Sequence, residues 1–160
     1  MRFVIAAGLG VSVLAACATS RKGTPSVAHA SVPFSYVSGS FLAVPVTIND
    51  SIQTTFVLDT GAGLNVIAKS FCAELKCPSA GTHQGKRMSG QEVSVPLSTV
   101  KSLRFANVRL TDTPVGVFDM EALMPGQKIG GFLSLEFFRD TAFTIDYQKH
   151  TVSMEDSASL

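Results

Sequence analysis

An aspartate stands at the end of an apolar run in residues 56–63, which read FVLDTGAG. Three apolar residues lead into Asp59, and the small residues after it allow the backbone to fold closely. A carboxylate at the edge of a core loses hydration, which disfavours its charged form unless neighbouring groups compensate. Such groups are common among general acids and bases. Asp59 is therefore the candidate for acid–base chemistry, although Asp-Thr-Gly alone is also ordinary turn sequence.

Metal chemistry is not indicated by the spacing of the ligand-type residues. The three histidines, His29, His83 and His150, lie far apart in the chain. Zinc sites require clustered histidine and cysteine ligands, and no such cluster is present in the sequence. We expect neither a metal nor another cofactor.

The first residues have the pattern of an export signal. Arg2 precedes an uncharged apolar run at residues 3–16, which is shorter than the roughly 20 residues of a membrane-spanning helix. Residues 14–17 (LAAC) resemble the lipobox of bacterial lipoproteins, in which the cysteine is acylated; the alternative is an ordinary signal peptide with an unrelated cysteine. The expected organisation is a signal at 1–16, a flexible tether at 17–31 and a folded domain at 32–156. Lipid on Cys17 would hold the domain at the periplasmic side of a membrane, and Ala18 in place of a retention aspartate favours the outer membrane.

Without residues 1–16 the chain keeps twelve basic and twelve acidic residues. This balance indicates neither a nucleic-acid partner nor a polybasic membrane patch. Cys72 and Cys77 remain as a closely spaced pair in what would be an oxidising compartment. They are predicted either to form a disulfide or to pack as two small buried residues.

Short extended segments separated by turn residues must position Asp59. β-Branched and aromatic residues predict a hairpin of two strands, and turn chemistry joins them at residues 49–51. Helix-forming residues predict one short helix at 66–75. Further strands are predicted at 93–97, 108–117 (interrupted by Pro114), 143–147 and 151–154, after the hairpin strands at 41–48 and 52–58. This pattern is typical of an all-β, small, closed barrel-like domain with one or two short helices.

Residues 34–154 resemble the retropepsin-like aspartic proteases, the single-lobe relatives of pepsin. Residues 56–62 match the catalytic motif of that family, and residues 65–67 (NVI) continue it. Residues 129–138 (IGGFLSLEFF) lie where the second apolar-apolar-glycine element falls, and residues 143–147 (FTIDY) are similar to the ending of bacterial members. The resemblance therefore implies an acid-protease lobe.

Two residues depart from the family pattern. Ser134 stands where bacterial members usually carry glycine, and its side chain is expected to crowd the loop beside the catalytic turn; the alternative is that the landmark shifts to Ile129-Gly130. Gly63 stands where serine or threonine is common, so a hydroxyl that would support Asp59 is missing.

The resemblance implies peptide hydrolysis by a water that two carboxylates activate while sharing one proton. Only one Asp-Thr-Gly is present, so a homodimer would supply Asp59 twice across a two-fold axis. Thr60 would then reach across the axis to the partner's backbone. Gly61 would allow a backbone geometry that a side chain obstructs.

The resemblance also implies a mobile flap over a peptide that binds as an added strand. The candidate is the segment 86–93, with Met88, Ser89 and Gly90 at its tip, and the alternative is an ordinary exposed hairpin. The expected pocket residues, which are core residues in the alternative interpretation, are Val115, Phe118, Phe132 and Leu133. The expected function is an exported aspartic endopeptidase. The alternatives are a catalytically silent module of the same fold that binds a peptide or protein, and a structural envelope lipoprotein.

Overall fold

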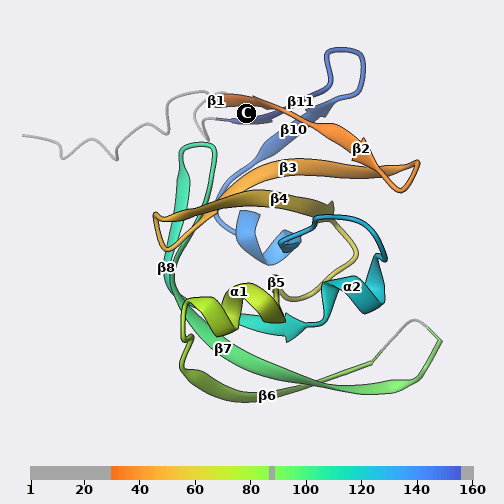
Figure 1. Ribbon diagram of the computed structural model, residues 1–160. Coiled ribbons are helices and arrows are strands. Elements are labelled where there is room, and N and C mark those ends of the chain that lie inside the picture. Colours follow the sequence, from red (N-terminus) through yellow and green to blue (C-terminus); the bar gives the residue numbers. More distant parts are fainter. Residues whose placement is uncertain (1–29, 87–88, 156–160) are drawn as a thin grey trace, which may run out of the picture.

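The computed structural model describes residues 30–86 and 89–155, and β-strands dominate them (Figure 1). None of the helices among these residues is long and apolar enough to cross a membrane. The elements are, in chain order, β1 (Ala30–Pro33), β2 (Ser35–Val37), β3 (Phe41–Ile48), β4 (Ile52–Asp59), β5 (Val66–Ala68), α1 (Lys69–Glu74), β6 (Ser79–Lys86), β7 (Glu92–Phe105), β8 (Val108–Phe118), α2 (Met120–Leu123), β9 (Gly131–Ser134), the 3₁₀ helix η1 (Leu135–Phe138), β10 (Phe143–Asp146) and β11 (Thr151–Met154).

The larger sheet closes into a barrel. Its strand order is β2-β3-β4-β9-β5-β8-β7-β6, and β3 pairs additionally with β7. The closing contact is short, with Thr47 opposite Arg104 and Ile48 opposite Leu103. The strand that ends at Asp59, β4, lies inside this ring between β3 and β9. The all-β, barrel-like fold predicted from the sequence is therefore confirmed.

A smaller sheet joins the two ends of the described chain. Its strand order is β1-β11-β10, and both pairings are antiparallel. The backbone N–H of Phe34, which follows β1, donates to the carbonyl oxygen of His150 at 2.9 Å. Figure 1 shows this sheet on the β2–β3 side of the barrel.

The predicted hairpin at residues 41–58 is present as β3 and β4, paired from Ala43 with Val57 to Ile48 with Ile52. Its turn contains Asn49 and Asp50, whose φ angles of 50° and 54° suit these two residue types. Ser102 and Arg109 donate to Asp50 Oδ2 at 3.2 and 2.6 Å. The hydrogen bond from Arg109 holds the pKa of Asp50 below its ordinary value.

The helix predicted at residues 66–75 is wrong in its first three residues. Val66–Ala68 forms β5, because these buried residues pair with both β8 and β9. The helix α1 begins only at Lys69.

The predicted interruption of the long strand at Pro114 is also wrong, because β8 continues through it opposite Thr99. The N–H of Thr99 donates to Pro78 on the other side of β7. The ladder therefore does not require the N–H that proline lacks.

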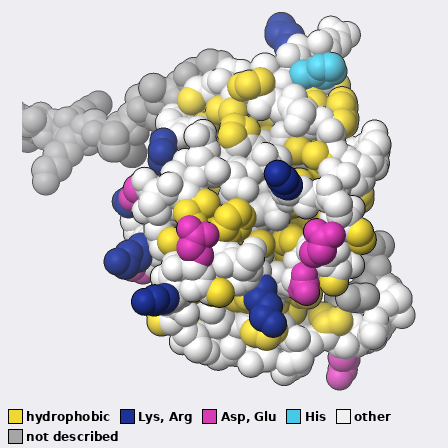
Figure 2. All heavy atoms as spheres, in the orientation of Figure 1, with side chains coloured by type: hydrophobic (Ala, Val, Ile, Leu, Met, Phe, Trp, Pro, Cys, Tyr) yellow, Lys and Arg dark blue, Asp and Glu magenta, His cyan; other side chains and the backbone are white. Residues whose placement is uncertain are grey.

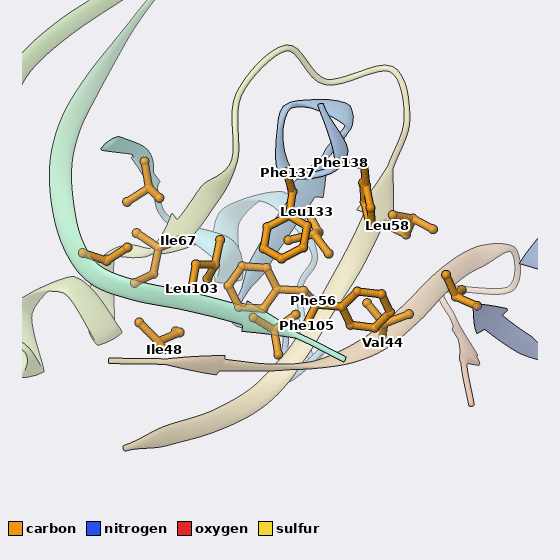
Figure 3. Packing of buried hydrophobic residues seen from close by; sticks show 14 of the residues in the cluster. Val44, Ile48, Phe56, Leu58, Ile67, Leu103, Phe105, Leu133, Phe137 and Phe138 are labelled. Carbon is orange, nitrogen blue, oxygen red and sulfur yellow. The ribbon is translucent and has the colours of Figure 1, made fainter. Parts of the chain in front are cut away.

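Two apolar clusters stabilise the barrel. The main cluster fills its interior, and Figure 3 shows aromatic rings from β4, β7 and η1 packed together there. Phe137 lies edge-on to both Phe105 and Phe138, with ring centroids 6.4 and 5.1 Å away. The smaller cluster packs around α2 and the adjacent strands, and its buried members are Val57, Val66, Ala68, Met120, Met124 and Ile129.

Candidate active site

The barrel delivers Asp59 to the end of a buried strand. Val57 and Leu58 are buried, Asp59 is half-buried, and Thr60 and Gly61 are exposed. The backbone N–H of Gly61 donates to Asp59 Oδ1 at 3.0 Å, and the N–H of Ala62 donates to the Asp59 carbonyl oxygen at 3.2 Å. The turn therefore orients the carboxylate through its own backbone and leaves it accessible from outside, as acid–base chemistry requires.

Ser134 lies beside Asp59 and binds the far end of the candidate catalytic loop, which is residues 60–65 between β4 and β5. It is opposite Asp59 in the parallel pairing of β4 and β9. Its backbone N–H and its hydroxyl both donate to Asn65 Oδ1, at 3.0 and 3.2 Å. The Glu136 N–H donates to Ser134 Oγ at 3.2 Å. The expected crowding by this side chain is therefore wrong, since hydrogen bonds accommodate the hydroxyl.

Neither steric crowding within the chain nor a positive φ angle requires glycine at the two glycine positions of the catalytic loop. A Cβ atom on Gly61 would meet only Asp59 Oδ1, at 3.4 Å, and one on Gly63 would meet no described atom within 4 Å. Neither residue has a positive φ. The obstruction expected at Gly61 is therefore not present among the described residues of one chain.

The four predicted pocket residues separate into two groups. Val115 and Leu133 are 1% and 0% exposed and belong to the main core, which favours the alternative interpretation for them. Phe118 and Phe132 are half-buried and pack against the smaller cluster. Phe132 pairs with Val57, two residues before Asp59, so its side chain lies on the face of the sheet that carries Asp59.

The predicted flap is part of the hairpin of β6 and β7. Paired residues run from Ser79 with Ser98 to Lys86 with Glu92. Ser89 and Gly90 are exposed near the turn, whereas Met88 lies outside the described residues. In Figure 1 the start of β7 and the end of β4 lie at the same side of the molecule, with α2 between them in this view. A flap role for the hairpin stays a prediction.

Two exposed apolar residues near Asp59 were missed by the sequence reasoning. Phe41 is 51% exposed and begins β3. Ala43 pairs with Val57. Two residues further along both strands, the same register places Phe41 opposite Asp59. Leu135, which is 46% exposed, directly follows Ser134 on the other side. The available signal was an aromatic residue at the start of the strand next to the Asp59 strand.

Asp59 lines neither of two surface cavities of the described residues. One of about 720 Å³ lies between α1 and α2 and is lined by Lys69, Phe71, Met120 and Lys128 among others. The other, of about 570 Å³, includes Gly63 and Leu64 of the catalytic loop.

Charged side chains of both signs are interspersed on the face seen in Figure 2. In the described part of the chain, no three His, Cys, Asp or Glu residues form a group that would hold a metal ion.

Cys72 and Cys77 lie at the end of α1 as free thiols, Cys72 buried and Cys77 half-buried. The N–H of Cys77 donates to the carbonyl oxygen of Cys72 at 3.0 Å. Burial, together with the neighbouring Cys72 thiol, raises the pKa of Cys77 from an ordinary 9.0 to about 12. A disulfide between the two residues stays a prediction.

The raised pKa of Cys77 predicts a loss of stability in alkali. Between pH 9 and pH 12 the unfolded chain releases the thiol proton while the folded chain retains it. The free energy of unfolding of the reduced protein therefore falls across this window. Cys77→Ser removes the ionisable group, so its unfolding free energy should fall less steeply in urea titrations at successive pH values. Equal slopes for the two proteins would contradict the assignment.

Comparisons with known proteins identify a family and a fold. A family model described as "Aspartyl protease" matches residues 44–137. The structure of a retropepsin-like aspartic protease from Rickettsia conorii superposes with a TM-score of 0.52 at 15% identity, covering 79% of this chain and 91% of that one. A retroviral protease-like domain of Ddi1 from Leishmania major gives a TM-score of 0.43 at 14% identity, covering 78% and 99%. No curated protein sequence matches significantly.

Proposed function

Because the chain belongs to the aspartyl protease family and has a retropepsin-like fold, we propose that it is an aspartic endopeptidase. The observation that carries the proposal is the position of Asp59, half-buried at the end of a buried strand and oriented by the Gly61 N–H. In the proposed reaction one carboxylate takes a proton from water while a protonated carboxyl donates to the carbonyl oxygen of the peptide. Two neighbouring carboxylates that share one proton supply both roles.

The second carboxylate is proposed to be Asp59 of a second copy. Several other acids already have partners away from the catalytic turn: Asp50 binds Arg109, Asp119 caps α2, and Asp146 binds Lys149. A two-fold axis beside the turn brings one carboxylate from each chain to a single site. In that arrangement the Thr60 hydroxyl binds the partner's backbone.

The surface around Asp59 supports contact with a second copy. Phe41 and Leu135 expose apolar area on either side of the turn. Gly61 and Gly63 leave room there for an approaching backbone. A self-complementary contact that buries this area removes apolar surface from water, which favours association.

Dimerisation predicts that specific activity falls on dilution, because a separated subunit holds half a site. The fall should coincide with dissociation measured by analytical ultracentrifugation. Phe41→Ser should shift both curves to higher protein concentration. The control is Tyr147→Ser, which removes another exposed aromatic side chain, 58% exposed, from the turn between β10 and β11. Full activity in the monomer would oppose the dimer and point to a second acid within one chain.

The substrate is proposed to be a peptide bound as an added strand beneath the β6–β7 hairpin. The half-buried rings of Phe118 and Phe132 favour apolar side chains next to the cleaved bond. Export and acylation of Cys17, which lies outside the described residues, would hold the enzyme at the periplasmic side of the outer membrane. Membrane fractionation of cells that express Cys17→Ser tests this anchor.

A further inference from the structure

We propose that Ser134 and Asn65 are positioning residues that hold the Asp59 carboxylate in its reactive place. This inference rests on the proposed peptidase function and concerns the same site. Neither side chain is a catalytic residue, since their hydrogen bonds go to each other and to backbone groups.

Ser134 is in register with one end of the catalytic loop and hydrogen-bonded to the other. The loop leaves β4 after Asp59 and enters β5 at Val66. Ser134 lies opposite Asp59, and both its N–H and its hydroxyl donate to Asn65 Oδ1. One residue of β9 therefore fixes the loop where it starts and where it ends.

Asn65 is in turn fixed to a third strand. Its carbonyl oxygen accepts a hydrogen bond from the N–H of Gly116 in β8 at 2.8 Å. Asn65 and Ser134 are 1% and 0% exposed, so water does not replace a hydrogen bond lost between them. A buried polar group that loses its hydrogen-bond partner destabilises the fold, so we expect these hydrogen bonds to hold Asn65 and Ser134 in one arrangement.

The Ser134 hydroxyl has one proton, and that proton is donated to Asn65 rather than to Asp59. Its oxygen accepts from the Glu136 N–H. Both hydrogen-bonding roles of the hydroxyl are therefore occupied. Neither role involves the Asp59 carboxylate, which stays available to water and to the partner carboxylate while these hydrogen bonds hold the loop in place.

The hydrogen-bonded pair of Ser134 and Asn65, called the clamp, also supports the loop in place of the hydroxyl that Gly63 lacks. Apart from the two chain neighbours of Gly63, no described atom lies within 4 Å of the place that a Cβ atom would take, so a serine or threonine hydroxyl there would need a partner further away or in solvent. Support for the loop comes instead from Asn65, two residues further on.

Ser134→Ala and Ser134→Gly remove the hydroxyl and keep the backbone N–H that donates to Asn65. Both changes make the residue smaller, so neither introduces a clash. We expect kcat to fall about tenfold in each, since small misplacements of a reacting group cost rate steeply, while KM changes less than about twofold.

Ser102→Ala is the matched control. Ser102 is also 0% exposed and its hydroxyl also donates, to Asp50 Oδ2 beside the opposite end of β4. This variant should lose thermal stability without losing kcat. Wild-type kcat in both folded Ser134 variants, or an equal loss of kcat in Ser102→Ala, would overturn the inference.

Amide hydrogen exchange separates this inference from the proposed function. The N–H groups of Gly61 and Ala62 bind Asp59, so a loosened loop should expose them to faster exchange. We expect faster exchange at these two amides in the Ser134 variants than in wild type or Ser102→Ala, whether or not the wild type cleaves peptides. Unchanged exchange at both amides would contradict the clamp even if the protein is an active peptidase.

Discussion

Asp59→Asn is expected to lower the rate of peptide cleavage by about 10³-fold or more, because the change removes the general base from the site. In a symmetric dimer one substitution removes both carboxylates. Asparagine has nearly the same shape, and its amide oxygen can still accept the hydrogen bond that the Gly61 N–H donates to Asp59. The variant should therefore fold, dimerise and bind peptide. Cleavage is followed by mass spectrometry of a peptide mixture at mildly acidic pH.

The thermal midpoint of the Asp59→Asn protein serves as the control for folding. It should equal or exceed that of the wild type, since two crowded carboxylates cost free energy when they lie close together. Cleavage that survives the substitution would rule out the aspartic mechanism. If neither protein cleaves and both bind peptide, the fold serves as a binding module.

Gly131→Ala is expected to destabilise the protein by about 3 kcal/mol or more. A Cβ atom on Gly131 would collide with the carbonyl oxygen of Val66 and lie 2.7 Å from a ring carbon of Phe56. Gly131 pairs with β4 on one side and β5 on the other, so the backbone has no free direction in which to move. The thermal midpoint should fall by roughly 10 °C.

Gly85→Ala is the matched control for this effect. Gly85 lies in β6, at the edge of the sheet, where a Cβ atom would make an ordinary contact of 3.4 Å with Val93. Calorimetry of the two variants should show a large loss for Gly131→Ala and a change within about 0.5 kcal/mol for Gly85→Ala. Similar midpoints for both proteins would mean that β9 does not pack between β4 and β5 as described.

The local parts of the fold were predictable because their signals lie close together in the chain. Turn residues between two β-branched runs are sufficient to predict the β3–β4 hairpin and to place Asp59 at its end. The strand β6 was predicted only as an extended flank of the flap candidate, without bounds, because its residues (SAGTHQGK) are almost all exposed and show no apolar alternation. The strand β6 forms because its backbone pairs with β7.

The non-local parts of the site were not predictable from pattern alone. Ser134 and Asn65 are 69 residues apart, and they meet because β9 pairs with both β4 and β5. In the sequence Ser134 is merely a departure from a resembled motif. Its hydrogen bonds depend on the register of β9 against β4 and β5, and no short turn joins β9 to either strand to fix that register.

Mixing wild-type and Asp59→Asn subunits tests most directly whether two Asp59 carboxylates form one site. After subunits exchange in an equal mixture at fixed total protein, random pairing leaves about one quarter of the dimers with both carboxylates. We predict that activity falls to about one quarter of the wild-type value at the same total concentration. Activity of about one half, as expected of subunits that work independently, would contradict a shared site.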